Sequence, residues 1–214
     1  MRIRNVKNKE QILENSKYLV KNPKENIGKW NKLFNNNNPI YIEIGMGKGK
    51  FIIENAKVYK DINFIGIERF DSIVAKALPK IEEGINNLLI IRMNALEIDE
   101  VFFNEVDRIY LNFSDPWPKV RHHSRRLTSN IFLDKYDRIF KGSNEIYLRT
   151  DNTDLFTYSI ETLSNKNYRL NDVTFDLHKE NENLITTEYE DKFTSKNMPI
   201  YSLKAIKDNV QNSK

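Results

Sequence analysis

A carboxylate, Asp115, stands in a run of prolines and cations that begins where an apolar stretch ends. The apolar stretch, Val106 to Phe113, is typical of a buried strand. Pro116 and Pro118 lack backbone donors and fix φ, so they should hold Asp115 and Trp117 on a stiff loop. The basic strip that follows contains Lys119, Arg121, His122, His123, Arg125 and Arg126. A rigid acid beside an indole ring and a cationic strip suits a cationic or aromatic reactant attached to a phosphate backbone. A surface loop with a solvated basic face would have the same sequence.

A second group of candidate residues follows another apolar strand, Ile40 to Ile44. Gly45, Gly47 and Gly49 form a turn there, and glycines let a ligand approach the backbone. Their spacing differs from the G-x-G-x-x-G that places a pyrophosphate on a helix N-terminus, and no P-loop pattern follows. Glu43, two residues before the first glycine, would repel a pyrophosphate but attract a cation. S-adenosylmethionine meets this requirement, because it carries a sulfonium and an ammonium and no phosphate.

Two further polar residues stand at the ends of predicted strands. Glu68 closes the strand Asn63 to Glu68, about 20 residues past the glycines, where a carboxylate can accept hydrogen bonds from ribose hydroxyls. It could also be a surface carboxylate paired with Arg69. Asn94 follows the strand Leu88 to Ile91, at a position where a side chain can contact an adenine or form an ordinary turn.

Strand and helix patterns alternate along most of the chain. We expect strands at 40–44, 63–68, 88–91, 106–113, 145–150, 173–177 and 200–206, with helices between the first five. This alternation predicts an α/β, Rossmann-like fold with a mostly parallel seven-stranded sheet and helices on both faces. The last two strands lack a full helix between them and predict an antiparallel edge strand. The candidate side chains would then meet where the parallel strands end, which is where such sheets bind ligands.

Composition excludes several classes of protein. The 214 residues include no cysteine, which excludes disulfides, thiolate catalysis and cysteine-ligated metals. His122 and His123 are neighbours and His178 is remote, so we expect no metal site. No run approaches the roughly 18 apolar residues of a membrane span, and Met1 to Lys7 has no signal-peptide core. We therefore expect a cytoplasmic protein with no membrane contact. The net charge of +4 is compatible with a nucleic-acid partner but does not prove one.

The run Asn35 to Pro39 is a strong breaker and divides the chain. We expect an N-terminal basic arm at 1–38 and a catalytic domain at 39–214. Arg2, Arg4 and Lys7 of the arm could reach a phosphate, or the arm could be a partly ordered tail.

With these motifs in order, the chain resembles the bacterial tRNA (guanine-N7)-methyltransferases. The matching motifs are Glu43-x-Gly45-x-Gly47-x-Gly49, Glu68, Ser114 to Lys119, Arg121 to Thr128, Arg149 to Asp151 and Thr187 to Glu190. The resemblance extends from Pro39 to Ile206. It implies a Rossmann-like methyltransferase fold and methyl transfer from S-adenosylmethionine to N7 of guanine 46 in the tRNA variable loop. We also expect no obligate protein partner, in a monomer or homodimer.

The resemblance also implies roles for single residues. The methyl-donor pocket would contain Glu43, Gly45, Gly47, Gly49, Glu68, Asn94 and Asp115, and Asp115 would also be the catalytic residue. Substrate contacts would come from Lys119, Asp151, Thr187, Glu188, Tyr189 and Glu190, and RNA contacts from Arg121, His122, Arg125 and Arg126. The chain departs from the family at Asn94, where Asp is usual, at Val120, which replaces a lysine, and in a shortened turn at Gly142 to Asn144.

Guanine N7 carries no proton, so its attack on a sulfonium methyl group needs no general base. Asp115 could instead stabilise the positive charge that moves to the purine, or accept a hydrogen bond from the guanine N1–H or N2–H edge. Trp117 could stack on the base or cap the end of the sheet. Alternative functions are methylation of another RNA position or a non-RNA substrate, RNA binding without a donor site, and NAD-dependent oxidation. Glu43, the three glycines and Glu68 oppose RNA binding without a donor site. Glu43 and the glycine spacing oppose NAD-dependent oxidation.

Overall fold

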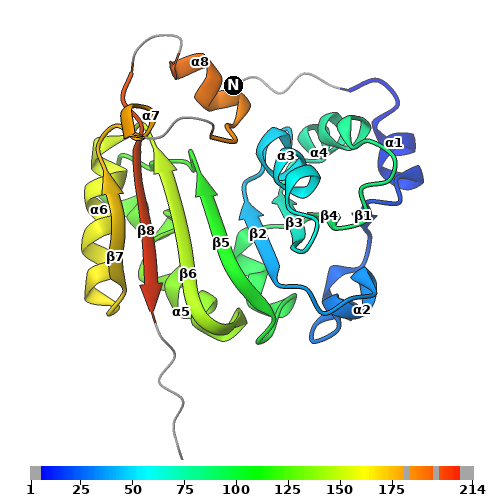
Figure 1. The fold of residues 1–214 in the computed structure, drawn as a ribbon, viewed down its shortest axis with the longest axis horizontal. Coiled ribbons are helices and arrows are strands. Elements are labelled where there is room, and N and C mark those ends of the chain that lie inside the picture. The colour runs from blue at the N-terminus through cyan, green and yellow to red at the C-terminus, as the bar shows by residue number, and fades with distance from the viewer. Residues whose placement is uncertain (1–5, 181–183, 195–197, 208–214) are drawn as a thin grey trace, which may run out of the picture.

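A computed structural model describes residues 6–180, 184–194 and 198–207. The strands in these ranges form one sheet with the order β1-β4-β3-β2-β5-β6-β8-β7 (Figure 1). Their bounds are β1 Leu19–Val20, β2 Ile40–Ile44, β3 Asn63–Glu68, β4 Leu88–Arg92, β5 Val106–Asn112, β6 Phe140–Thr150, β7 Arg169–Thr174 and β8 Tyr201–Lys207. The predicted α/β class and mostly parallel sheet are confirmed.

The last two strands form the predicted antiparallel pair at the edge of the sheet, with β7 as the edge strand. Strand β8 runs antiparallel to both β6 and β7, and it lies between them instead of at the edge. It pairs with β6 from Thr150 opposite Tyr201 to Asn144 opposite Lys207. Leu203 of β8 is opposite Leu148 of β6, and both are buried. Burial of these paired apolar side chains favours the position of β8 between β6 and β7, one strand in from the edge.

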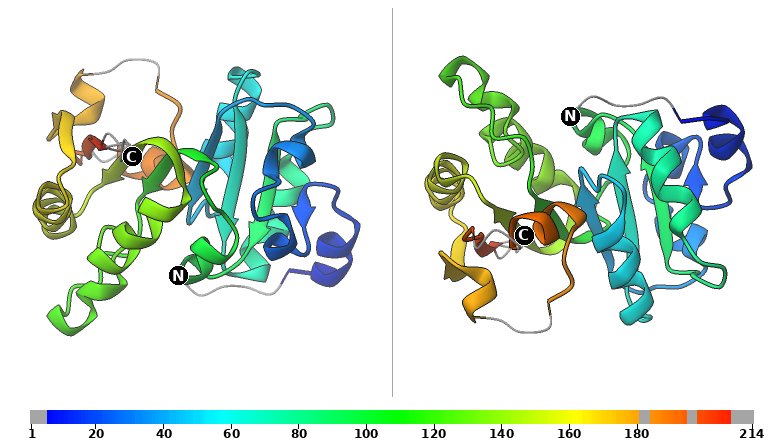
Figure 2. Two further views of the ribbon diagram at one scale, coloured as in Figure 1. Left: turned by 90° about the horizontal axis from the view of Figure 1, so that it is seen from below. Right: turned by 90° about the horizontal axis from the view of Figure 1, so that it is seen from above.

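Helices pack on both faces of the sheet, as predicted (Figure 2). One face is covered by α1 (Lys9–Asn15), α3 (Lys50–Val58) and α4 (Asp71–Ala77), and the other by α2 (Trp30–Phe34), α5 (Asn130–Ile139) and α6 (Thr153–Asn165). Helix α4 ends at Ala77, because Pro79 lies in the 3-10 turn η2 (Leu78–Lys80) that follows. The shorter elements are η1 Pro23–Asn26, η3 Ala95–Glu100, η4 Val120–Arg125, α7 Leu177–Glu180 and α8 Glu188–Thr194.

Much of the N-terminal arm packs into the domain. Strand β1 pairs in parallel with β4 and adds an eighth strand to the seven predicted. Trp30 is fully buried, and its indole N–H donates to the carbonyl oxygen of Val101 at 2.9 Å. Lys7 is exposed; Arg2 and Arg4 lie outside the described residues. The division of the chain at residue 38 stays a prediction.

The sheet has a topological switch point beside β2. From β2 the chain continues through β3 and β4 on one side, and then returns to form β5 on the other side. Ligands bind at such points in open α/β sheets, outside the carboxyl ends of the strands. None of the helices in the described part of the chain is long and apolar enough to span a membrane.

Candidate active site

Glu43 of β2 and Asn112 of β5 lie side by side at the switch point. The Asn112 side-chain amide donates to Oε1 of Glu43 at 2.9 Å, and only 1% of Glu43 is exposed. The other carboxylate oxygen, Oε2, has no hydrogen-bond partner. Burial raises the pKa of Glu43 to about 8, although the bond from Asn112 opposes this shift. A buried carboxylate with an unpartnered oxygen is costly, and a cationic ligand would satisfy it.

The glycine turn crosses the ends of β2 and β3. The backbone N–H groups of Gly45 and Met46 both donate to the carbonyl oxygen of Ile67, at 2.8 and 3.0 Å. Gly45 and Gly49 have φ values of 80° and 82°, which favour glycine, and Gly49 leads directly into α3. The turn therefore runs from the buried Glu43 to the first turn of a helix, as the sequence predicted.

Glu68 is the last residue of β3, and its carboxylate faces the backbone of the next two residues. Its Oε1 accepts hydrogen bonds from the N–H groups of Arg69 at 2.9 Å and Phe70 at 3.1 Å. Glu68 is buried, and this burial raises the pKa of its carboxyl group. The contact with Arg69 thus uses the backbone N–H of Arg69, so the alternative of a surface carboxylate paired with the Arg69 side chain does not describe Glu68. Contact with a ribose stays a prediction.

Asn94 is exposed at the start of η3, where its side-chain oxygen accepts a hydrogen bond from the N–H of Leu96 at 3.1 Å. It also lines an open cavity of about 810 Å³ beside β3 and β4. The lining residues are Lys21, Asn22, Pro23, Lys24, Glu25, Arg69, Phe70, Arg92, Met93, Asn94, Glu97 and Val101. Lys24 fixes the arm on this cavity through ion pairs with Glu97 at 2.8 Å and Glu100 at 2.6 Å. Sequence reasoning missed this contribution of the arm.

Arg126 anchors the loop that follows β5 through hydrogen bonds to its backbone. Its side chain is fully buried, and its guanidinium donates to the carbonyl oxygens of Pro116 at 2.8 Å and Trp117 at 3.4 Å. It also forms an ion pair with Asp154. Trp117 adopts a φ of 43°, a strained value for an aromatic residue. The expected RNA contact by Arg126 is therefore wrong in this structure, because the residue anchors the loop and is not at the surface.

Asp115 is exposed on this anchored loop, three positions beyond Asn112. Lys119, Arg121 and Arg125 are also exposed, so these members of the basic strip are accessible to a polyanion. The Arg125 guanidinium lies 4.9 Å from the Trp117 ring.

The two neighbouring histidines are both partly buried. His122 contacts the Trp117 ring edge-on at 5.7 Å, and His123 contacts Tyr158 at 5.4 Å. In the described residues, no group of three or more His, Cys, Asp or Glu side chains could hold a metal ion.

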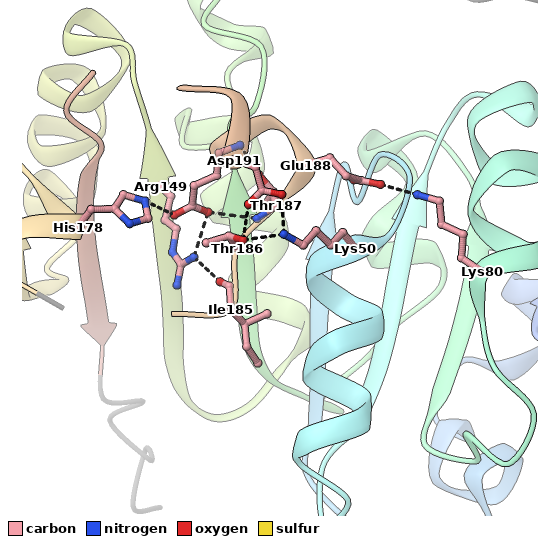
Figure 3. A network of polar contacts seen from close by, with 10 residues as sticks. Lys50, Lys80, Arg149, His178, Ile185, Thr186, Thr187, Glu188 and Asp191 are labelled. Atoms are coloured by element: carbon pink, nitrogen blue, oxygen red, sulfur yellow. Dashed lines mark hydrogen bonds and ion pairs between the residues drawn. The ribbon is translucent and has the colours of Figure 1, made fainter. Parts of the chain in front are cut away.

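Thr187 and Glu190 form a capping box at the start of α8. The N–H of Glu190 donates to Thr187 Oγ1 at 2.9 Å, and the N–H of Thr187 donates to Glu190 Oε2 at 3.2 Å. The fully buried Glu190 also pairs with Arg149 at 3.3 Å and with His178 at 3.0 Å. Arg149 donates as well to the carbonyl oxygen of Ile185 at 2.8 Å (Figure 3). Both capping residues thus stabilise the segment, and a contact of either with substrate stays a prediction.

Glu188 and Tyr189, which lie between the two capping residues in the sequence, make contacts outside the capping box. Tyr189 is exposed, its ring lies 4.9 Å from that of Phe113, and its hydroxyl donates to Asp151 at 3.2 Å. These contacts bring together the ends of β5 and β6 and the start of α8, and contact of Asp151 or Tyr189 with substrate stays a prediction. Glu188 forms an ion pair with Lys80 of η2.

The comparisons with known proteins agree with this geometry. A family model described as "Putative methyltransferase" matches residues 37–203. Among solved structures, an antibiotic-related methyltransferase (19% identity, TM-score 0.63) and the 16S rRNA methyltransferase KamB (12% identity, TM-score 0.63) each align with 85% of this chain and 93% of their own. The fold and the matching family model define a protein of the methyltransferase class.

Curated relatives narrow the class to one family. A tRNA (guanine-N(7)-)-methyltransferase from Oceanobacillus iheyensis is 47% identical over 92% of this chain and 93% of its own. Those from Lachnoclostridium phytofermentans and Streptococcus pneumoniae strain 70585 are 46% and 45% identical, over 97% and 96% of this chain and 99% of their own. The chain belongs to the tRNA (guanine-N(7)-)-methyltransferase family.

Proposed function

We propose that this protein transfers the methyl group of S-adenosylmethionine to N7 of guanine 46 in the variable loop of tRNA. The observation that carries the proposal is Glu43, a buried carboxylate with an unpartnered oxygen beneath a glycine turn. This is a site for a cationic ligand without phosphate, in a chain whose relatives are named for methylation of tRNA guanine N7. A tRNA substrate also fits the expected cytoplasmic location.

The proposed donor site would extend from Glu43 to Asn94 along the carboxyl ends of β2, β3 and β4. Glu43 would pair with the positive charge of the donor, Glu68 with its ribose hydroxyls, and Asn94 with its adenine. A structural neighbour, the 16S rRNA (adenine(1408)-N(1))-methyltransferase from Catenulisporales acidiphilia, was solved with SAM as cosubstrate; it is 13% identical with a TM-score of 0.58. The likeness supports the same fold, and the residues of this chain support the same donor.

The chemistry depends on alignment. The donor supplies an electrophilic methyl group, and the N7 lone pair attacks it without loss of a proton. Holding the two reactants in line can remove roughly 7–11 kcal/mol from a barrier. Asp115 is exposed on a loop that Arg126 fixes, so its carboxylate can stabilise positive charge on the purine or select guanine by its N1–H and N2–H edge.

The RNA would approach over the exposed members of the basic strip. Lys119, Arg121 and Arg125 supply positive charge for phosphates. Tyr189 and Asp151, which are joined by a hydrogen bond of 3.2 Å, would contact the base from the other side of the Asp115 loop. His122 is partly buried against Trp117 and would make a smaller contribution.

Incubation with methyl-labelled S-adenosylmethionine and bulk tRNA, followed by digestion to nucleosides, tests the proposal. We expect the label in 7-methylguanosine. Label in another nucleoside would support methylation of a different RNA position, and the absence of label from RNA would contradict the proposal.

A further inference from the structure

Residues 185–191, named here the α8 segment, contact two regions at the carboxyl ends of the strands (Figures 1 and 3). One region contains α3 and η2, and the other is the end of β6. On the side of the glycine turn, Lys50 immediately follows Gly49 and begins α3. Its ammonium lies 2.5 Å from Asp191 Oδ2 and donates to Thr186 Oγ1 at 2.8 Å. Lys50, the first residue after the glycine turn, therefore contacts two residues of the α8 segment, Thr186 and Asp191.

Lys80 makes a second connection between the glycine turn and the α8 segment. Its ammonium forms an ion pair with Glu188 of the α8 segment. The same ammonium donates to the carbonyl oxygen of Lys48, inside the glycine turn, at 3.1 Å. A displacement of the turn would therefore change the contacts of Lys80 with the segment.

The opposite side of the α8 segment faces the residues proposed to receive the base. Arg149, at the end of β6, holds the carbonyl oxygen of Ile185 and the carboxylate of Glu190. Tyr189 contacts Phe113 and Asp151. Glu190 is fully buried in these contacts, whereas Lys50 and Lys80 retain 34% and 43% of their side-chain exposure.

Exposed ion pairs contribute only about 0–1 kcal/mol each. The lysine contacts are thus too weak to hold the α8 segment rigidly, while the buried contacts of Arg149 and Glu190 fix its other side. The side of the α8 segment that contacts Arg149 is therefore fixed, and the side that contacts the two lysines is adjustable. The adjustable side can shift when the glycine turn moves.

We infer that Lys50 and Lys80 are positioning residues that couple donor binding to tRNA binding. A donor seated on the glycine turn sets the positions of Lys48 and Lys50. The contacts of Lys50 and Lys80 with Thr186, Glu188 and Asp191 then adjust the exposed side chain of Tyr189, which lies between these residues in the sequence, while the buried contacts of Arg149 and Glu190 stay in place. This inference rests on the proposed function, because it takes the turn as the donor site and the α8 segment as part of the base site.

The test measures the dissociation constant of tRNA with and without saturating S-adenosylhomocysteine. For the wild-type protein we expect tRNA to bind at least about five-fold more tightly in its presence, the lower end of typical coupling between sites. Lys50→Ala and Lys80→Ala should each reduce this ratio to below about two-fold. The tRNA affinity without the nucleoside should change much less, because these residues transmit the coupling and do not form the RNA surface.

Lys57→Ala is the matched control. Lys57 lies on the same helix as Lys50 and forms comparable ion pairs with Glu54 at 3.0 Å and Glu82 at 2.7 Å. It should keep the wild-type ratio. The charge exchange Lys50→Asp with Asp191→Lys should restore part of the coupling, because both side chains are partly exposed and the pair can form in reverse.

Two results would overturn the inference: a wild-type ratio close to one, or a wild-type ratio retained in both lysine variants. Parallel nucleoside digests separate this failure from failure of the proposed function. If the wild-type protein forms 7-methylguanosine while the lysine variants keep full coupling, only the inference is wrong. If the wild-type protein methylates no RNA, the proposed function is wrong as well.

Discussion

Asn112 donates a hydrogen bond of 2.9 Å to the buried carboxylate of Glu43, and this bond joins the two strands that flank the topological switch point. The bond orients Glu43 and uses only one of its oxygens. The second oxygen has no partner in the protein. Burial raises the pKa of this group to about 8, and a cationic ligand bound there would favour its charged form.

Glu43→Gln should remove most of the attraction for a cationic donor while keeping the size of the side chain. We expect the dissociation constant of S-adenosylmethionine, measured by calorimetry, to rise by about ten-fold or more, or about 1.4 kcal/mol. Glu54→Gln, on the exposed side of α3, is the control and should leave the affinity unchanged. An unchanged affinity in Glu43→Gln would remove Glu43 from the donor site.

The pH dependence of stability should also depend on Glu43. Its pKa is raised to about 8 in the folded protein from an ordinary value of 4.5, because of burial. Between these values the folded protein holds a proton that the unfolded chain has released, so the free energy of unfolding should fall as pH rises from about 4.5 to 8. Urea denaturation at several pH values would show this fall in the wild-type protein relative to Glu43→Gln. A difference between the two proteins that does not vary with pH would contradict the raised pKa.

Arg126→Met should destabilise the fold, because the carbonyl oxygens of Pro116 and Trp117 would lose the donor that the buried arginine supplies. We expect a loss of about 2–4 kcal/mol in the free energy of unfolding. Arg125→Met, one position earlier and exposed, should change it by less than about 0.5 kcal/mol. Equal effects of the two substitutions in urea denaturation would contradict the anchoring role of Arg126.

The strands that carry the donor site could be predicted closely, because β2 to β5 have apolar sequences bounded by turn residues. Strand β1 has only two residues and leaves no periodic pattern. Strand β7 was predicted four residues too late, since Asn171 and Asp172 interrupt its pattern while Val173 and Phe175 extend an apolar pattern beyond its end. Tertiary pairing with β8 determines the bounds of β7.

The positions of candidate residues were predictable where a residue stands at the end of a strand or just beyond it, and their roles stay predictions. Glu43, Glu68 and Asp115 are of this kind. The burial of Arg126 was not predictable, because the sequence of a basic strip does not show whether a given arginine contacts RNA or a carbonyl oxygen of the loop. The capping box of Thr187 and Glu190 has a recognisable T-x-x-E spacing, and the same two side chains could also hydrogen-bond a base edge, so the sequence left both roles open.

The exposed arginines of the basic strip should determine the salt dependence of tRNA binding. Arg121→Ala combined with Arg125→Ala should reduce the slope of log K against log salt by about 1–2, if each residue neutralises one phosphate. Donor affinity should not change. A slope equal to that of the wild-type protein would make the strip a solvated surface.

Asp115→Asn should lower kcat by about 100-fold or more, as expected for loss of one group that stabilises charge in the transition state. Single-turnover methylation of tRNA, at saturating donor, measures this directly. Near-normal turnover with unchanged preference for guanine would eliminate both roles proposed for Asp115.

The central claim, attack by guanine N7 on the methyl donor, is tested most directly with tRNA that carries 7-deazaguanine at position 46. This base keeps the ring and the N1–H and N2–H edge of guanine but lacks the N7 lone pair. We predict that the protein methylates the guanine-46 transcript and binds the 7-deaza transcript with similar affinity but without methyl transfer. Methyl transfer to the 7-deaza transcript at the rate of the unmodified one would contradict the account.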